Sequence, residues 1–540
     1  MQRRSIVTPI RRQFWSQFWS SWAVLLTALP SQAAERIYVR YQFVEFSISV
    51  TDLETFVATG EASDELDFYL DRLSAEQQSQ IRQLLQARYE ISPVAMARMS
   101  YSSAGDRLLS QMGELLQTPS GLNGWYAIRS ALIRSTADPA GLTLINFLRY
   151  FPTDLRLNLA ETLAFVSRAT SLIGEIETTM TALQQLAERP SADTNPNPSP
   201  GDLRQAGASQ GSRQTLTLVD GTRDRRLMVD LYLPAATPTP APVLILSNGL
   251  GASRQRFVPL ANHLMSHGFA VVVPDHPGSD AERQRAFYAG YYTEPFDAME
   301  YIDRPLDITF VLDELDRRNP LEFDSQLNLQ QVGILGYSFG GTTALSLLGA
   351  TIDFQQLEQD CGSTPDVLNI SILYQCRALE LPRRPVDLQD NRIQAAFLFV
   401  PFGRSVFGQS GLSQVTRPVF WSATDADILT PLSIEQVPPF GWLASPDKYL
   451  VVADGLPHTR VVLQLMNRFM RQPLSGEEAS LVTQQYLNAL SVAFFKVYVA
   501  EEPGYRPYLE ATHIHQLAEP AYPLSLVRQL PDRLVNNRQD

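Results

Sequence analysis

The stretch Val332-Gly-Ile-Leu-Gly-Tyr-Ser-Phe-Gly-Gly341 decides the fold. Its apolar run Val332–Leu335 predicts a short strand buried on both faces, and the residues after the final glycine pair predict a helix. Gly336 and Gly340 lack side chains that would clash across a sharp turn between these two elements. Such a turn pushes the Ser338 hydroxyl out above the sheet, at a helix N-terminus whose dipole favours a developing anion. The pattern therefore predicts a nucleophilic serine, with a turn serine that caps the helix as the alternative.

A serine is nucleophilic near neutral pH only when a base accepts its proton and an acid orients that base. On this kind of turn the three residues follow the chain order serine, acid, histidine. Three of the six histidines follow Ser338, namely His458, His513 and His515. His458 comes shortly after the predicted strand Tyr449–Val452 and is the expected base. His513 and His515 could form a metal pair, but no carboxylate stands at ligand spacing, so a surface or packing role is favoured.

The acid is expected after the preceding strand, which the sequence predicts at Val419–Ser422. Asp425 and Asp427 can both be reached from the end of that strand. We select Asp427, because Pro431 follows four residues later at the start of the next helix. Asp425 is the reserve, and it could equally be a turn or N-cap residue.

An oxyanion hole is the remaining requirement of acyl transfer. One donor is expected to be the backbone N–H of Phe339, directly after the serine. The second is expected in the loop after the predicted strand Val243–Leu246, where Gly249 and Gly251 let backbone N–H groups turn inward. We nominate the Leu250 N–H, and each such donor contributes about 3 kcal/mol to transition-state stabilisation. A plain tight turn is the alternative for this loop.

Strand-like and helix-like segments alternate from Thr215 onward, which predicts an α/β fold with a doubly wound, mostly parallel sheet over residues 215–540. Asp220-Gly221 separates two strand-like runs and predicts a hairpin. The predicted central strands are Val243–Leu246, Ala270–Val273, Val332–Leu335, Ala395–Phe399, Val419–Ser422 and Tyr449–Val452. The predicted helices are Phe257–His267, Pro305–Asp316, Thr342–Leu348, Ile434–Leu443 and Val461–Arg471.

Residues 34–189 show a different rhythm, with strand-like alternation after Ile37 and helical periodicity from Leu66 onward, so they predict a smaller, mainly helical domain. Ser74-Ala-Glu-Gln77 and Thr51-Asp-Leu-Glu54 both resemble capping boxes. Residues 190–214, rich in proline, serine and asparagine, predict a linker.

Residues 1–33 have the order of a secretory signal peptide: a basic start, an apolar run and small residues before a cleavage site. Arg11-Arg12-Gln13-Phe14 also resembles a twin-arginine export motif, with an ordinary basic start as the alternative. The expected location is the periplasm or the exterior of a bacterial cell. Two cysteines in an exported chain predict a disulfide between Cys361 and Cys376, with two buried free thiols as the alternative.

Composition excludes several classes of protein. The 540 residues are 44% hydrophobic and 19% charged, which excludes a disordered chain and a multi-span membrane protein. The net charge of −13 argues against nucleic acid as a partner. Two cysteines are too few for a zinc or iron–sulfur site built on thiolates.

The motif-bearing residues resemble the α/β-hydrolase superfamily, and more narrowly its platelet-activating-factor acetylhydrolase and dienelactone-hydrolase-like branch. The resemblance spans about residues 230–475, and the region from Glu35 through the helical segment is similar to a bacterial domain of unknown function found ahead of such hydrolases. It implies fold and reaction class, and no substrate. The segments that carry it are Leu246–Ala252, Pro274–Ser279, Arg304–Asp307, Gly336–Gly341, Ala426-Asp427 with Pro431, and Pro457-His458.

Two positions depart from the pattern of that branch. Its oxyanion loop usually begins His-Gly, whereas this loop begins Asn248-Gly249. Dienelactone hydrolases use a cysteine where this chain has Ser338, so lactone specificity is not carried over. Residues 352–390, which hold both cysteines, are interpreted as a cap insertion near the mouth of the pocket. His276 follows a predicted strand, close to where ligands bind in open sheets, but a structural role is favoured.

The sequence thus predicts an exported serine ester hydrolase with the triad Ser338, Asp427 and His458, and no metal or organic cofactor. The expected partner is a small-molecule or lipid ester, and the family branch alone suggests a short-acyl phospholipid type. Peripheral membrane contact stays open, and the sequence does not set the oligomeric state. The alternatives are a non-catalytic envelope binding protein on a hydrolase scaffold, or an acyltransferase or peptidase that uses the same triad.

Overall fold

A computed structural model describes residues 33–41, 44–187, 201–236, 238–362, 367–458 and 476–536. The predicted signal peptide, apart from its last residue, lies outside these described residues, as do the whole of the predicted helix Val461–Arg471 and part of the predicted linker. The chain divides into two compact units. The smaller comprises Met1–Ser100 and Leu109–Ala164, and the larger comprises Tyr101–Leu108 and Phe165–Asp540.

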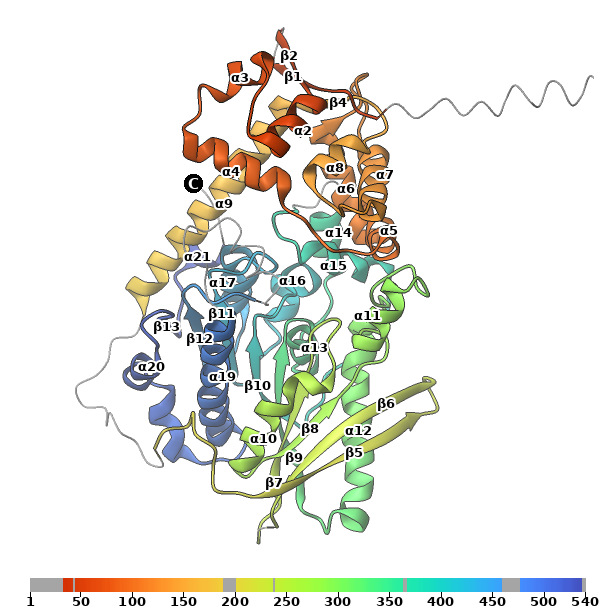
Figure 1. The fold of residues 1–540 in the computed structure, drawn as a ribbon. Coiled ribbons are helices and arrows are strands. Elements are labelled where there is room, and N and C mark those ends of the chain that lie inside the picture. Colours follow the sequence, from red (N-terminus) through yellow and green to blue (C-terminus); the bar gives the residue numbers. More distant parts are fainter. Residues whose placement is uncertain are drawn as a thin grey trace, which may run out of the picture. The chain divides into compact units, whose positions relative to one another are not determined.

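The larger unit is built on a mixed sheet, in which nine strands pair within the described residues (Figure 1). Neighbours from β8 through β7, β9, β10 and β11 to β12 are parallel, while β5, β6 and β13 join antiparallel at the two ends. In spatial order the strands are β13 (Leu524–Val527), β12 (Lys448–Ala453), β11 (Val419–Thr424), β10 (Ile393–Phe399), β9 (Leu327–Tyr337), β7 (Ala241–Ser247), β8 (Ala270–Pro274), β6 (Arg225–Pro234) and β5 (Gly211–Asp220).

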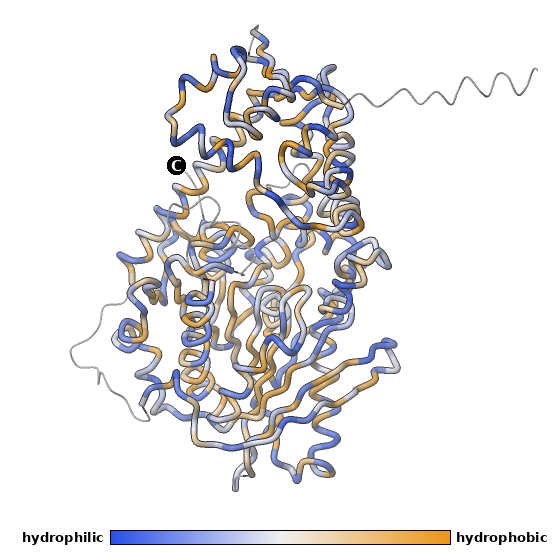
Figure 2. The backbone as a smooth tube through the Cα atoms, in the orientation of Figure 1, coloured by the Kyte–Doolittle hydropathy of each residue, from blue (hydrophilic) through white to orange (hydrophobic). Residues whose placement is uncertain are grey.

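Helices cover both faces of this sheet, because alternate residues of the buried strands face opposite layers. In β7, Val243 and Ile245 belong to one buried core together with α12 and α13, while Leu244 and Leu246 belong to the other together with α10 and α19. The central strands are mostly apolar along their length (Figure 2). The helices are η1 (Arg254–Phe257), α10 (Val258–Ser266), α11 (Ala281–Tyr288), α12 (Glu300–Glu322), α13 (Phe339–Leu347), α14 (Phe354–Cys361), α15 (Ile372–Gln375), η2 (Cys376–Glu380), α16 (Arg404–Leu412), η3 (Leu432–Gln436), α17 (Val437–Trp442), α19 (Gly476–Tyr498), η4 (Pro503–Leu509), α20 (Ala511–Leu517) and α21 (Asp532–Val535).

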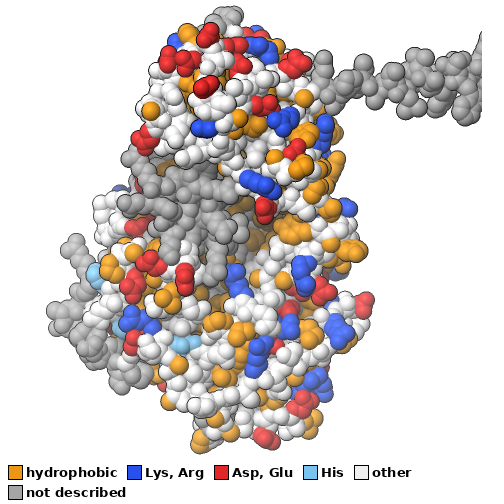
Figure 3. All heavy atoms as spheres, viewed as in Figure 1, with side chains coloured by type: hydrophobic (Ala, Val, Ile, Leu, Met, Phe, Trp, Pro, Cys, Tyr) orange, Lys and Arg blue, Asp and Glu red, His pale blue; other side chains and the backbone are white. Residues whose placement is uncertain are grey.

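The predicted fold class is confirmed. Each of the six predicted central strands lies within a strand of the sheet, and the predicted hairpin joins β5 to β6 around Asp220 and Arg225. Acidic and basic side chains are interspersed on the face of the larger unit that Figure 3 shows. None of the helices in the described part of the chain is both long enough and apolar enough to cross a membrane.

The smaller unit combines helices with a sheet of four described strands in the order β2-β1-β4-β3. Its own core gathers around Ala131, Phe151 and Leu155. Ser74 and Gln77 form the predicted capping box, but the box predicted at Thr51 is wrong, because Ser49 is the N-cap of α2. The elements before residue 187, some of which extend into the larger unit, are β1 (Arg36–Tyr41), β2 (Val44–Ser49), α2 (Val50–Thr59), α3 (Asp64–Leu70), α4 (Ala75–Gln86), α5 (Pro93–Tyr101), α6 (Ser103–Leu115), β3 (Leu116–Gln117), α7 (Trp125–Ala137), α8 (Leu144–Arg149), β4 (Leu155–Asn158) and α9 (Leu159–Leu186).

The division between the units falls inside helix α9, whereas the sequence places the domain boundary at residue 189. From Phe165 onward α9 belongs to the larger unit, and its residues Met180 and Leu183 are buried in the larger core. After α13, the region predicted as a cap insertion contains α14, α15 and η2. A disulfide joins Cys361 at the end of α14 to Cys376 at the start of η2.

Candidate active site

Ser338 occupies the turn between β9 and α13 with φ 52° and ψ −116°. A positive φ is uncommon for a residue with a side chain, and this combination lies outside the left-handed helical region. The Ser338 N–H donates to the Phe399 carbonyl at 2.9 Å, which ties the turn to the neighbouring strand. Ser338 is partly exposed although the residues on both sides of it are buried. The strained turn therefore presents the serine at the carboxyl end of the sheet.

Three glycines make this turn sterically possible. A Cβ at Gly336 would lie 2.2 Å from the Gly340 carbonyl oxygen, and one at Gly340 would lie 1.9 Å from the Ser247 carbonyl oxygen. A Cβ at Gly341 would lie 2.6 Å from the Pro401 Cβ. A side chain at Gly336 would force the turn itself open, and one at Gly340 or Gly341 would push the turn away from the end of β7 or from the residues after β10.

Asp427 follows β11 and His458 follows β12, and the two side chains contact each other. The His458 Nδ1 lies 2.5 Å from the Asp427 Oδ2, and both side chains are buried. The Asp427 Oδ1 also accepts the N–H groups of Leu429 at 2.8 Å and Thr430 at 3.1 Å, and the Thr430 hydroxyl donates to Oδ2. Burial raises the pKa of Asp427, but the facing His458 ring and the hydrogen bonds from His458 and Thr430 outweigh it and hold the pKa below its ordinary value.

Asp425, the reserve acid, has another partner. Its carboxylate accepts the Gly455 N–H at 2.7 Å and so fixes the loop that leads to His458. Burial raises the pKa of Asp425, and the neighbouring Asp454 adds to the increase. Of the two carboxylates, that of Asp427 contacts the His458 ring, while that of Asp425 supports the backbone before it.

The His458 backbone is anchored next to the serine. The Tyr337 hydroxyl donates to the His458 carbonyl at 3.0 Å, and the two rings lie 5.4 Å apart between centroids. Because Nδ1 faces Asp427, Nε2 is the nitrogen left to accept a proton. The described residues include no hydrogen bond between the Ser338 hydroxyl and His458, and such contacts commonly tighten only when substrate binds.

The two nominated oxyanion donors belong to two segments near the serine, the start of α13 and the loop after β7. Phe339 is the first residue of α13, so its N–H has no acceptor within the helix. A Cβ at Gly249 would lie 3.3 Å from the Ser338 Cβ, which places the loop after β7 against the nucleophile. Leu250 follows in this loop and lines the same cavity as His458.

Arg304 donates hydrogen bonds to the loop after β7. The sequence assigned this residue no role, although its segment carries part of the family resemblance. It lies on α12 and is 1% exposed. Burial lowers the pKa of Arg304 to about 10, while Glu300 and Asp307 oppose that decrease. Its guanidinium donates to the Asn248 carbonyl and to the hydroxyls of Ser279 at 3.0 Å, Thr343 at 3.1 Å and Ser247 at 3.3 Å.

His276 belongs to the same buried network. Its Nε2 lies 3.2 Å from the Ser247 hydroxyl, and its Nδ1 lies 3.1 Å from the Asp307 Oδ2. Burial, together with the charge of Arg304, lowers the pKa of His276 well below its ordinary value. A neutral ring between Ser247 and Asp307 fits the structural role that the sequence favoured.

His513 and His515, the possible metal pair, and Asn248 of the oxyanion loop lie outside the triad. His513 and His515 lie on α20, where the His513 ring packs against Tyr508, and no group of metal-ligating side chains occurs in the described part of the chain. The Asn248 side chain is 2% exposed, and neither of its polar atoms has a hydrogen-bond partner among the described residues. A buried amide without a partner costs free energy, and such groups gather at functional sites.

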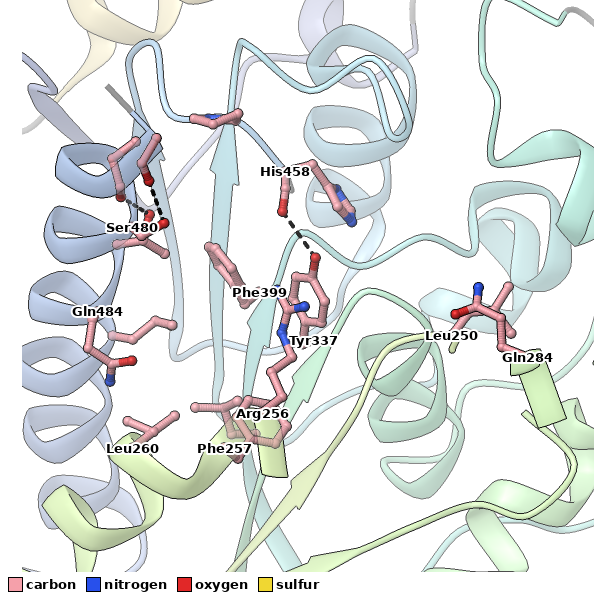
Figure 4. A pocket seen from close by; sticks show the side chains of 16 residues that line it. Leu250, Arg256, Phe257, Leu260, Gln284, Tyr337, Phe399, His458, Ser480 and Gln484 are labelled. Atoms are coloured by element: carbon pink, nitrogen blue, oxygen red, sulfur yellow. Dashed lines mark hydrogen bonds between the residues drawn. The ribbon is translucent and has the colours of Figure 1, made fainter. Parts of the chain in front are cut away.

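A cavity of about 590 Å³ opens beside His458 (Figure 4). Leu250 and Gln284 line one side of it, and residues of α19 such as Gln484 and Leu487 line the other. Arg256 of η1 extends along Tyr337 toward His458. The candidate base therefore faces a space large enough for a small organic substrate.

Two segments of the chain match family models. Residues 33–158 match a family described as an alpha/beta hydrolase of unknown function (DUF1400), and residues 242–351 match the alpha/beta hydrolase fold. The second match includes the loop after β7 and the Ser338 turn, and it ends before Asp427 and His458. No curated protein matches the sequence. These matches support alpha/beta hydrolase families and hydrolase activity, whereas the narrower acetylhydrolase-like branch stays a prediction.

Proposed function

We propose that the protein is an exported serine hydrolase of carboxylic esters, with Ser338 as nucleophile, His458 as base and Asp427 as the orienting acid. The observation that carries the proposal is the buried Asp427–His458 pair beside a serine held in a strained turn. Backbone strain of this kind costs about 1–3 kcal/mol and persists only where the surroundings enforce it. Backbone strain at a serine with only a structural role would lower stability without any functional benefit, so the strain disfavours a non-catalytic scaffold.

The first half of the reaction forms an acyl-enzyme. The Ser338 oxygen attacks the ester carbonyl while its proton passes to Nε2 of His458, and Asp427 stabilises the resulting imidazolium. The carbonyl oxygen becomes an anion, which the N–H groups of Phe339 and Leu250 stabilise. The tetrahedral intermediate then breaks its bond to the alcohol oxygen, and that oxygen takes the proton from His458.

The second half regenerates the serine. Water attacks the acyl carbonyl and gives its proton to His458, and the same N–H groups hold the second oxyanion. The bond to the Ser338 oxygen then breaks, Ser338 recovers its proton from His458, and a carboxylic acid leaves. An acyltransferase differs only in using another acceptor in place of water, so both reactions need the same triad.

We also propose a substrate class and a cellular location. A short or medium acyl group, including a phospholipid-type ester at a membrane surface, is supported by the family resemblance. Export to the periplasm or the cell exterior is supported by the character of residues 1–33.

Hydrolysis of p-nitrophenyl esters of increasing acyl length tests the proposal. We expect Ser338→Ala and His458→Ala to lose about a thousandfold or more in kcat. Asp427→Asn is expected to lose far more activity than the matched control Asp425→Asn, because only Asp427 contacts the base. Equal rates for the parent protein and Ser338→Ala would refute the assignment.

A further inference from the structure

The cavity beside His458 contains a cation whose charge the proposed chemistry does not use. Arg256 lines this cavity, and the lining contains no carboxylate among the described residues. The positive charge therefore shares a cavity with the candidate base in a protein whose net charge is −13.

Arg256 differs from its neighbour on the same turn. Arg254 pairs with Asp230 at 3.2 Å and also with Asp275, so its charge is neutralised locally. The Arg256 guanidinium instead lies over the Tyr337 ring, 4.3 Å from its centroid, and makes no ion pair within the described part of the chain. Tyr337 also accepts a hydrogen bond from Arg256, and the other N–H groups of the guanidinium can bind a planar or tetrahedral anion through charge-assisted hydrogen bonds.

The surroundings define what such an anion is attached to. Phe257, Leu260, Phe399 and Leu487 supply an apolar wall, and Gln284 adds a polar amide near the oxyanion loop. Tyr337 separates Arg256 from His458, since its ring contacts the guanidinium on one side and lies 5.4 Å from the imidazole centroid. Because His458 and Leu250 of the oxyanion loop line the same cavity as Arg256, an anion on Arg256 shares that cavity with the candidate base.

We propose that this cavity is an anion subsite, in which Arg256 binds a carboxylate or phosphate group of the substrate. The preferred substrates are then esters that carry a negative charge a few bonds from the scissile carbonyl, with an apolar spacer between the two groups. This inference deepens the proposed ester hydrolase function and rests on it for the identity of the reacting group.

Two ester pairs test the subsite. Mono-p-nitrophenyl glutarate is compared with neutral p-nitrophenyl valerate, and the butyryl ester of glycerol phosphate with monobutyrylglycerol. We expect Arg256→Ala to lower the ratio of kcat/KM for the anionic over the neutral ester by about tenfold or more, mainly through KM. The matched control is Arg506→Ala, another exposed arginine that lies over a tyrosine ring, outside this cavity. It is expected to keep the parent ratio.

The two pairs distinguish the source of the charge. If Arg256→Ala loses its preference only for the glutarate ester, the ligand is a carboxylate, and if it loses its preference only for the glycerol phosphate ester, the ligand is a phosphate. The proposal is overturned if neither ratio changes in Arg256→Ala. Binding of mono-p-nitrophenyl glutarate to Ser338→Ala, measured by calorimetry, provides a readout without turnover. We expect the added change Arg256→Ala to weaken that binding about tenfold, and unchanged binding contradicts the subsite. If the parent protein hydrolyses no ester, the proposed function fails, while this titration still decides the subsite.

Discussion

At the scale of single residues, the turn around Ser338 depends on glycines, because a Cβ at their positions would clash with neighbouring atoms. The serine is held at positive φ, and its neighbours in the turn approach backbone oxygens more closely than a methyl group allows. The contact between Gly336 and the Gly340 carbonyl is local in sequence, and the motif alone predicts the turn, whereas the contacts of Gly340 with Ser247 and of Gly341 with Pro401 are tertiary. His458 and Asp427 can also be predicted from the sequence, because each follows a buried strand at a short distance along the chain.

Gly340→Ala tests the steric requirement. The new methyl group would lie 1.9 Å from the Ser247 carbonyl oxygen, so the turn and the oxyanion loop must move apart. We expect the free energy of unfolding to fall by about 2 kcal/mol or more, with esterase activity lost. The matched control is Gly174→Ala on helix α9, where a Cβ meets no atom within 4 Å, and its stability should rise by up to about 1 kcal/mol. Equal stability of the two variants in urea denaturation contradicts this account.

His263 makes stability depend on pH. Burial, with a smaller contribution from His267, lowers the pKa of His263 to about 4 in the folded state, whereas the unfolded value is about 6.5. As the pH falls between these values the unfolded chain binds the proton first, so the free energy of unfolding decreases. We expect His263→Gln to show a weaker decrease than the parent protein in urea denaturation between pH 7 and pH 4. The exposed His515→Gln should follow the parent, and parallel curves for all three proteins would contradict the assignment.

Arg304 is a residue whose role the sequence could not reveal. Its contact with Asn248 joins positions 56 residues apart, and neither helical periodicity nor motif spacing reports such a contact. The strand-to-helix turn could be predicted because its glycines and serine form one contiguous motif in the sequence. The loop that completes the site is held by tertiary contacts, and only the fold brings these together.

At the scale of elements, helix α12 carries Arg304 and so fixes the loop that supplies an oxyanion donor. Arg304→Lys keeps the charge but cannot reproduce a planar group that donates to several oxygens at once. We therefore expect kcat to fall about ten- to hundredfold while KM changes little, since the defect appears only in the transition state. Arg318→Lys on the same helix, a partly exposed residue that pairs with Glu314, is the control. A rise in KM with unchanged kcat would argue against a positioning role.

The disulfide of the region after α13 is a second element-scale feature. It joins residues 15 positions apart, and both cysteines are buried in the larger core. Closing a loop of this length stabilises the folded state by about 3 kcal/mol in the chain-entropy model. We expect the double variant Cys361→Ser, Cys376→Ser to lose stability of that order. A double variant as stable as the oxidised parent protein would show that the crosslink contributes nothing.

The strands differ in how well the sequence predicts them. Those of the larger sheet are continuous apolar runs, because they are buried on both faces. β3 and β4 have only two and four residues and were not predicted, since periodicity needs a longer window. At the start of α2, the sequence predicts a cap at Thr51, whereas the structure uses Ser49 two residues earlier.

At the scale of the whole molecule, the division of the chain depends on packing that composition does not show. The proline-rich stretch after residue 189 is the strongest signal for a boundary. The second half of α9 nevertheless shares the core of the larger unit through Met180 and Leu183. The family matches reflect two parts as well, one on each side of this helix.

The central claim is that Ser338 is an activated nucleophile, and covalent labelling tests it most directly. A fluorophosphonate reacts with serines that a neighbouring base activates, and peptide mass spectrometry then locates the adduct. The account predicts one adduct on Ser338 in the folded parent protein, formed at least a hundredfold more slowly in His458→Ala. A parent protein that stays unlabelled at Ser338, or that labels equally fast without His458, would contradict it.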